Sequence, residues 1–167
     1  KDKNLWAGLN NGISFIAYNS AIKYIKPSKT NELSGYSSRI LNNSLYIATS
    51  DGVYSAPLSD ANKDLSFSKA DFTFISNSGG QAWHLDEVNR QLMIGHHNGA
   101  YIVKNNQATQ LTHDGGVWLF VPTSSISPSK NVLAGTYSGL TMLDFADSEF
   151  LNSARINGLW ESIRFLA

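Results

Sequence analysis

Two adjacent histidines, His96 and His97, are the residues whose types most directly suggest chemistry. Imidazole side chains bind metal ions and transfer protons near neutral pH. The pair lies in a predicted turn, where neighbouring side chains of an extended backbone point to opposite faces. The sequence next to the pair holds neither a cysteine nor a cluster of carboxylates. We therefore interpret both histidines as turn residues, and we predict no metal site and no cofactor.

Aromatic rings combined with polar side chains form the second group of candidates. An exposed ring stacks on the face of a sugar, while nearby polar side chains bind the sugar hydroxyls. If the chain binds a glycan or a small solute, we expect the binding residues to lie near the predicted inner strands. These residues are Tyr36, Arg39, His84, Trp118 and Arg164.

Acidic residues near the same strands raise the alternative of an enzyme. Asp86, Glu87 and Glu161 are the candidates, because paired carboxylates can hydrolyse glycosidic bonds. The sequence gives no separation in space for any such pair, and no phosphate-binding loop or dinucleotide fingerprint is present. We therefore predict a protein that is not an enzyme.

The composition restricts the class of protein. The 167 residues include 13 Lys and Arg against 13 Asp and Glu, so the formal net charge is zero. This balance argues against a nucleic-acid-binding segment, which usually carries an excess of basic residues. Hydrophobic residues make up 42% of the chain, which is ample for a core. The absence of cysteine excludes disulfides, thiolate zinc sites and thiol catalysis.

An internal repeat predicts the fold. Residues 5–12, 45–52, 92–99 and 132–139 share one pattern: apolar residues, a small residue, three mostly polar residues and a glycine. The last glycines, Gly12, Gly52, Gly99 and Gly139, are separated by 40, 47 and 40 residues. A period of about forty residues filled with short strands is typical of β-propeller blades.

Each repeat can be read as part of a blade of four antiparallel strands. The motif glycine supplies the positive φ of a tight hairpin between the second and third strands. The small residue before it (Gly8, Ala48, Gly95 or Gly135) indicates a close approach by another backbone or by a large ring, for which a tryptophan is the obvious candidate. Only residues 148–156 resemble a short amphipathic helical turn.

Tryptophans mark the predicted inner strands. Trp83, Trp118 and Trp160 are 35 and 42 residues apart, and with Trp6 they are expected to pack between blades. The predicted divisions are blade parts at 1–34, 35–77, 80–112 and 115–157, and the start of a further inner strand at 158–167. The whole of 1–167 is then one all-β propeller segment.

The repeat resembles a known family at this point. Residues 4–16, Asn-Leu-Trp-Ala-Gly-Leu-Asn-Asn-Gly-Ile-Ser-Phe-Ile, look like the two-component-regulator propeller repeat, roughly Leu-Trp-(Ile/Leu)-Gly-(Thr/Leu)-x-x-Gly-(Leu/Ile). Residues 114–118, 134–140 and 158–165 are similar to the sensor region of bacterial transmembrane regulators that carry a triple-tyrosine domain. The second and third copies depart from the pattern, with Ala48 for glycine and Met93 for tryptophan.

The resemblance implies a function and a location. It implies an extracytoplasmic, periplasmic sensor that binds a small solute or glycan and acts through further blades and downstream signalling domains of a membrane-anchored protein. The alternative is a non-catalytic scaffold propeller that binds another protein.

Two alternatives for the ring remain open in the sequence. The chain begins at Lys1 without a charged and then apolar leader, so we expect a piece of a longer protein. We favour a slice of a larger ring, because no capping segment is recognisable at either end of the repeats. In the other interpretation, the terminal inner strand joins the first blade part and closes a four-bladed ring. A slice exposes apolar faces at its ends, which predicts self-association.

Overall fold

The computed structural model describes residues 5–16, 24–58, 65, 71–113, 115–125 and 127–166. Within these ranges the regular structure is fourteen β-strands and one turn of 3-10 helix, Thr123–Ser125. The prediction of an all-β protein is therefore confirmed. No helix in the described part of the chain is long and apolar enough to cross a membrane.

The strands form four antiparallel sheets, each a simple up-and-down meander. A hairpin contains β1 (Leu5–Leu9) and β2 (Gly12–Ile16). Sheet I contains β3 (Gly35–Leu41), β4 (Ser44–Thr49), β5 (Gly52–Pro57) and β6 (Thr73–Phe74). Sheet II contains β7 (Ala82–Val88), β8 (Gln91–His96), β9 (Gly99–Lys104) and β10 (Gln107–Gln110). Sheet III contains β11 (Val117–Pro122), β12 (Val132–Thr136), β13 (Gly139–Ala146) and β14 (Glu149–Arg155).

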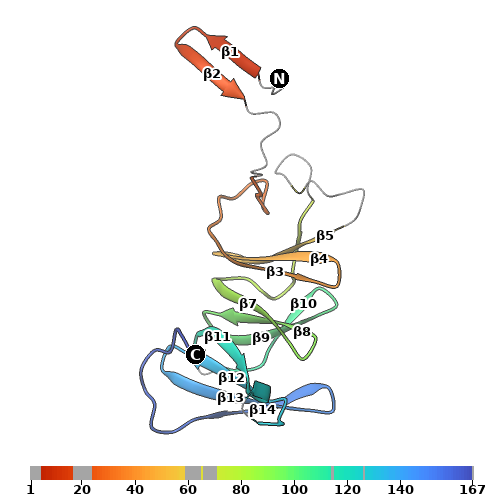
Figure 1. The fold of residues 1–167 in the computed structure, drawn as a ribbon, viewed down its shortest axis with the longest axis vertical. Coiled ribbons are helices and arrows are strands. Elements are labelled where there is room, and N and C mark those ends of the chain that lie inside the picture. Colours follow the sequence, from red (N-terminus) through yellow and green to blue (C-terminus); the bar gives the residue numbers. More distant parts are fainter. Residues whose placement is uncertain are drawn as a thin grey trace.

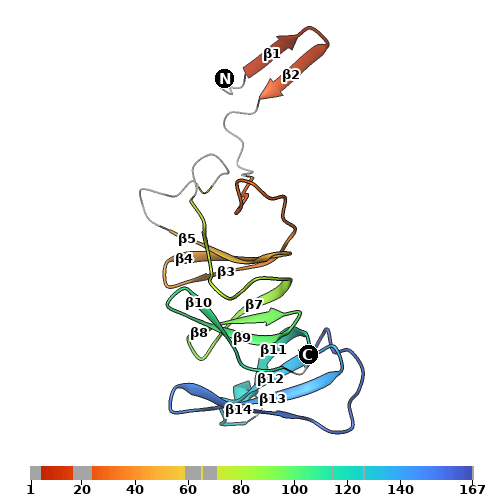
Figure 2. The same ribbon diagram turned by 180° about the vertical axis from the view of Figure 1, so that it is seen from behind.

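Sheets I, II and III stack face to face in chain order, and the β1–β2 hairpin stands apart from the stack (Figure 1). The reverse view shows the same open arrangement (Figure 2). The described sheets do not close into a ring, which agrees with part of a propeller. Residues 148–156 are the stretch that most resembles a short helical turn, but residues 149–155 form β14 and pair with β13 in an antiparallel ladder.

The core lies between the sheets. One cluster fills the space between sheets I and II, and a second fills the space between sheets II and III. Strand β8 contributes to both, since Leu92 and Ile94 point toward sheet I while Met93 points toward sheet III. This alternation follows from the two-residue period of a strand and explains why an interior sheet is apolar on both faces.

The motif glycines behave as predicted. Gly52, Gly99 and Gly139 have φ of +130°, +137° and +134°. The tight turns at Asn42-Asn43, Asn89-Arg90, Asn105-Asn106 and Asp147-Ser148 also have positive φ, from +47° to +66°. Asn and Asp tolerate this region best after glycine. The Asn42-Asn43 pair therefore forms a tight turn, which ends where Ser44 begins β4.

At Gly95 and Gly135 the small position of the repeat lies against the backbone of the chain segment that follows the sheet. A Cβ on Gly95 would lie 2.7 Å from the Val117 carbonyl oxygen, and one on Gly135 would lie 2.6 Å from that of Ile163. The predicted close approach is therefore present, but the approaching group is a carbonyl and not a tryptophan ring. Real Cβ atoms do not come this close to an oxygen, so a larger residue there would push the sheets apart.

The same contacts place the C-terminal segment. The Ile163 amide donates to the Thr136 carbonyl oxygen at 2.9 Å, so Ile163 takes the place that Val117 takes in the preceding sheet. Residues 156–166 form no strand, and Trp160 is 64% exposed. The expectation that Trp160 marks an inner strand is wrong, because the chain reaches the inner position only at Ile163.

Substituting Gly99 tests the close approach between sheets. Gly99→Ala should lower the free energy of unfolding by about 2–5 kcal/mol, because it combines positive-φ strain with a clash. The clash is with the Thr112 carbonyl oxygen, which lies where the new Cβ would be. Urea denaturation followed by circular dichroism measures the loss.

Gly115→Ala is the matched control. Gly115 has φ of +94° but no atom within 4 Å of its Cβ position. Its substitution should cost only the conformational strain of about 1–2 kcal/mol. Equal losses in the two variants would contradict the role given to the close approach.

Candidate functional site

The inner strand of each sheet contains a β-bulge at an aromatic residue. The pairing register shifts between Gly35 and Ser37 in β3, between Ala82 and His84 in β7, and between Val117 and Leu119 in β11. The extra residues are Tyr36, Trp83 and Trp118. A bulge redirects a side chain and is frequent next to functional sites. Here it turns one ring per sheet toward the neighbouring sheet.

These rings form a continuous ladder across the stack. The centroids of Tyr36 and Trp83 are 4.9 Å apart, and those of Trp83 and Trp118 are 5.3 Å apart. The rings are tilted by 50° and 38°, within the geometry that aromatic pairs favour. Tyr36 lies at the open end of the ladder and is 43% exposed.

Tyr137 holds the centre of the ladder in place. Its ring lies 4.7 Å from Trp118, and its hydroxyl accepts a hydrogen bond from Trp83 Nε1 at 2.7 Å. The same hydroxyl lies 3.0 Å from His97 Nδ1. Gly116 leaves room for the Tyr137 ring, which occupies the space where a Cβ would be. Gly116, the second glycine of the pair 115–116, thus has a packing role at this position.

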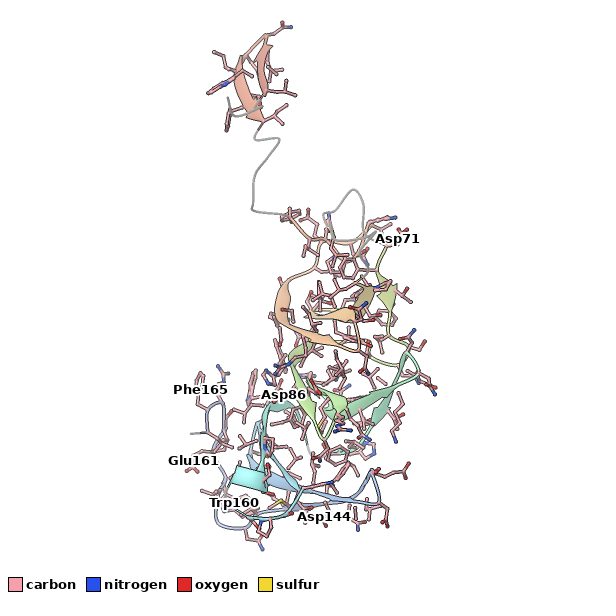
Figure 3. All side chains as sticks on the ribbon, turned by 45° about the vertical axis from the view of Figure 1, so that its right-hand side comes forward. Asp71, Asp86, Asp144, Trp160, Glu161 and Phe165 are labelled. Atoms are coloured by element: carbon pink, nitrogen blue, oxygen red, sulfur yellow. The ribbon has the colours of Figure 1, made fainter. Side chains whose placement is uncertain are left out.

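The C-terminal segment extends the ladder by a cation. The Arg164 guanidinium lies over the Trp118 ring, 4.3 Å from its centroid, and Trp118 Nε1 donates to Ser162 Oγ at 3.0 Å. Arg164 therefore occupies the ladder position after Trp118. Trp160, Glu161 and Phe165 also lie on this terminal segment beside the last sheet (Figure 3).

A polar row lies on the same inner strands. Arg39 of β3 forms an ion pair with Asp86 of β7, which joins sheets I and II. His84 of β7 packs 6.4 Å from the Phe120 ring of β11. Burial lowers the pKa of His84; the Asp86 carboxylate opposes this shift, and the Arg39 guanidinium adds to it. Asp86 is labelled in Figure 3 on the stack of sheets.

The structure thus places the five sequence-predicted residues on the inner strands and the terminal segment. Two of them, Tyr36 and Trp118, belong to the ring ladder, and Arg164 continues it. The other two, Arg39 and His84, belong to the polar row. We call the ladder and the row together the inner-edge strip, which consists of Tyr36, Arg39, Trp83, His84, Asp86, His97, Trp118, Tyr137 and Arg164.

Sequence reasoning did not include several members of this strip. Trp83 was expected only as core, and Asp86 was weighed only as an acid for hydrolysis. The position of Trp83 in the tryptophan motif was the available signal, since Trp118 was chosen on that ground. No pattern in the sequence indicates that Tyr137 and His97 approach Trp83, because that contact joins two different sheets.

His96 differs from its neighbour His97. It ends β8 and is 2% exposed, and its Nδ1 accepts a hydrogen bond from the Asn98 amide at 3.1 Å. Thr49 and Thr136 take this position in the other sheets, and their hydroxyls accept the equivalent amide at 3.2 Å. Burial lowers the pKa of His96. The described residues contain no group of three or more side chains able to hold a metal ion.

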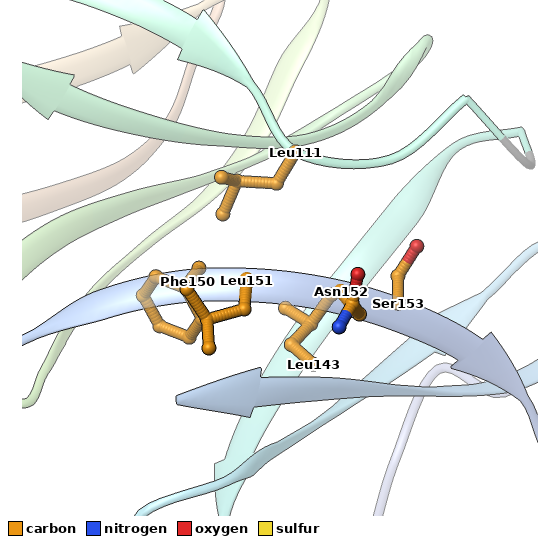
Figure 4. Close-up of a pocket in the computed structure, with 6 residues that line it drawn as sticks. All are labelled: Leu111, Leu143, Phe150, Leu151, Asn152 and Ser153. Carbon is orange, nitrogen blue, oxygen red and sulfur yellow. The ribbon is translucent and has the colours of Figure 1, made fainter. Parts of the chain in front are cut away.

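A cavity of about 320 Å³ lies elsewhere, between sheets II and III (Figure 4). Leu111 faces Leu143 and Phe150 across it, and Asn152 and Ser153 are the polar residues of its lining. Leu111 and Phe150 also pack against the second core cluster. No residue of the inner-edge strip lines this cavity, so we interpret it as a gap in sheet packing.

Comparisons with protein-family models, with curated proteins and with solved structures give no match to this chain.

The buried His96 and the half-buried His84 predict a loss of stability in acid. Their pKa values are lowered in the folded protein, so the unfolded chain binds protons that the folded chain does not as pH falls below about 6.5. The free energy of unfolding should therefore fall between pH 7 and pH 5. Urea midpoints at the two pH values measure the change.

His96→Thr separates the contribution of His96. Threonine should keep the turn bond, as Thr49 and Thr136 do, so the variant should fold and lose less stability between pH 7 and pH 5 than the parent chain. His84→Gln is the companion variant for the second histidine. A pH dependence unchanged in both variants would contradict this account.

Proposed function

We propose that this chain is the ligand-sensing, non-catalytic part of a bacterial regulator outside the cytoplasm, and that its inner-edge strip binds a small solute or a glycan. The observation that carries the proposal is the ladder of Tyr36, Trp83 and Trp118, with a polar row on the same strands. Partly exposed rings beside hydrogen-bonding side chains are the usual composition of a carbohydrate or small-solute site.

The chemistry of the strip favours an uncharged, hydroxyl-rich ligand. Asp86 neutralises Arg39, and the chain as a whole has a formal net charge of zero. The partly exposed ring of Tyr36 offers a stacking face at the end of the ladder. The imidazole of His97 and the hydroxyl of Tyr137 offer hydrogen bonds near its centre.

The strip also suggests how binding is transmitted. Its members come from three successive sheets and from the terminal segment, so one ligand would contact several sheets at once. A ligand that binds one relative arrangement of these sheets more tightly would shift the population toward it. The extracytoplasmic location and the downstream signalling domains rest on the resemblance of the repeat, with Leu5, Trp6 and Gly12 as its most typical residues.

A scaffold that binds another protein is the second candidate. Large apolar side chains on the C-terminal segment favour it: Phe165 is 90% exposed and Trp160 is 64% exposed. Exposed apolar patches commonly mark protein interaction sites. Binding to a protein partner with no response to soluble sugars would favour this candidate.

A panel of neutral oligosaccharides tests the ligand-sensing proposal. At least one should raise the melting temperature of the chain, since a ligand that binds only the folded state stabilises it. Tyr36→Ala and Arg164→Ala should each weaken the Kd about five- to tenfold, close to the roughly 1 kcal/mol of one aromatic or cation–π contact. Titration of tryptophan fluorescence measures the Kd.

Trp160→Ala is the matched control, because Trp160 is an exposed ring outside the strip. Its Kd should equal that of the parent chain. The assignment fails if no oligosaccharide changes the melting temperature. It also fails if Trp160→Ala weakens binding as much as Tyr36→Ala does.

A further inference from the structure

The β1–β2 hairpin exposes an unusually apolar face. Trp6 is 70% exposed, Ile13 is 76% exposed and Phe15 is 49% exposed. The Trp6 and Phe15 rings lie 4.6 Å apart, so one face of the hairpin carries a contiguous aromatic patch. A two-stranded hairpin by itself is at best marginally stable in water, and such a surface calls for a partner.

The register of the hairpin shows which way this face should point. Gly8 pairs with Ile13 in the hairpin, as Ala48 pairs with Val53 in sheet I and Gly95 pairs with Ala100 in sheet II. Val53 and Ala100 are both 0% exposed, and each packs in the core shared with the following sheet. The equivalent face of the hairpin, with Gly8 and Ile13, therefore matches the face that covers the next sheet in the chain.

Sheet I offers the complementary surface. Leu45 and Ile47 of β4 match Leu92 and Ile94 of β8, which fill the core between sheets I and II. On sheet I the same positions are only half-buried, and they line a groove of about 430 Å³ together with Ile25 and Tyr36. Sheet I therefore carries an apolar face in the place where sheets II and III each receive a preceding sheet.

A polar contact repeats between neighbouring sheets and has a counterpart here. The Val53 amide donates to Ser78 Oγ at 2.9 Å, and the Ala100 amide donates to Thr112 Oγ1 at 3.0 Å. Ser78 lies four residues before Ala82, and Thr112 lies five residues before Val117, the residues ahead of the bulges in β7 and β11. Thr30 lies five residues before Gly35, the residue ahead of the bulge in β3, and is exposed. An offset of four or five residues before Gly35 gives Asn31 or Thr30, and Thr30 is the one with a hydroxyl, like Ser78 and Thr112.

We infer that the hairpin docks on the open face of sheet I of its own chain, with Trp6, Gly8 and Ile13 against the groove. The length of the connection supports docking within one chain. Residues 17–34 connect β2 to β3, the inner strand of sheet I. In the stacked sheets, the equivalent connections are residues 58–81 between β5 and β7 and residues 105–116 between β9 and β11. The connection from the hairpin is shorter than the first of these and longer than the second, so it is long enough to join two sheets that pack on each other.

Thiol labelling of the full chain tests the docked face. The chain contains no cysteine, so each variant has a single thiol. Ile13→Cys lies on the inferred contact face, and Ala7→Cys lies on the opposite face of the hairpin. At low protein concentration the I13C thiol should react with a maleimide at least tenfold more slowly than the A7C thiol, because docking buries position 13 as it buries Val53 and Ala100.

A second substitution links this protection to docking. Gly8 matches Gly95, where a Cβ would lie 2.7 Å from a carbonyl oxygen of the next sheet. Gly8→Val in the I13C background should restore fast labelling, whereas Ala7→Val, on the other face, should leave the protection unchanged. Equal labelling of I13C and A7C in the parent background would overturn the inference. Protection that disappears on dilution would also overturn it, since the groove would then receive the hairpin of a second copy.

Discussion

The close contact between the backbone of one sheet and the chain entering the next sheet is the constraint on which the stack depends. At Gly95 and Gly135 the carbonyl oxygens of Val117 and Ile163 occupy space that a side chain would need. Side chains normally hold packed sheets about 10 Å apart, so such an approach requires a residue without a large side chain on each sheet. Because the contact is made by one particular backbone atom, it fixes the position of the following inner strand along its own axis. It also fixes the distance between that strand and the preceding sheet. A repeat that keeps this position small therefore reproduces the same sheet-to-sheet geometry at each step.

The inner-edge strip follows from that geometry. Val117 is the last regularly paired residue before the bulge in β11, so fixing its position also fixes the direction of the Trp118 ring. The same arrangement in β3 and β7 places one ring per sheet at the same height in the stack. The rings therefore come within stacking distance as a consequence of the repeated geometry. Arg164 follows Ile163 as Trp118 follows Val117, and it lies over the Trp118 ring. The repeat geometry therefore determines where the side chain lies, but not which residue type occupies that position. Each favourable ring contact contributes about 0.5–1.5 kcal/mol beyond burial, so the strip also holds the sheets together.

Much of this fold could be predicted from the sequence, because the motif glycine and its turn are local features. The hairpin between the second and third strands of each sheet and the all-β class both follow from them. The inner strand could not be placed by the same means, because its distance along the chain from the preceding motif glycine varies widely. The inner strand that follows Gly52 begins at Ala82, whereas the one that follows Gly99 begins much sooner, at Val117. With such variable connections, tryptophan spacing is a poor guide, and Trp160 was assigned to a position that Arg164 occupies.

Contacts that join two sheets lie beyond local patterns for the same reason. The Tyr137 hydroxyl meets the Trp83 indole only because the connection between their sheets sets both positions. The polar row shows the same limit, since the ion pair of Arg39 with Asp86 joins β3 to β7. The sequence therefore indicates which residues stand on inner strands, while the stacking of the sheets decides which of them meet.

The two ends of the stack differ in a way that bears on ring size. Sheet III is already partly covered, because the Ile163 carbonyl oxygen of the terminal segment lies against Gly135 as the Val117 carbonyl oxygen lies against Gly95. Sheet I lacks its preceding sheet, and the hairpin carries the face that matches it. A closed four-bladed ring and a slice of a larger ring both require this contact between the hairpin and sheet I. They differ at the free edge of β1, because β4, β8 and β12 each pair at that edge with an inner strand. They also differ at the outer face of sheet III, which packs on the first blade only in the closed form. The terminal segment, with Phe165 at 90% exposure, is the part of this chain that would fill that edge in the closed form. Ring size is therefore decided at these two places, and the packing of the hairpin on sheet I is common to both forms.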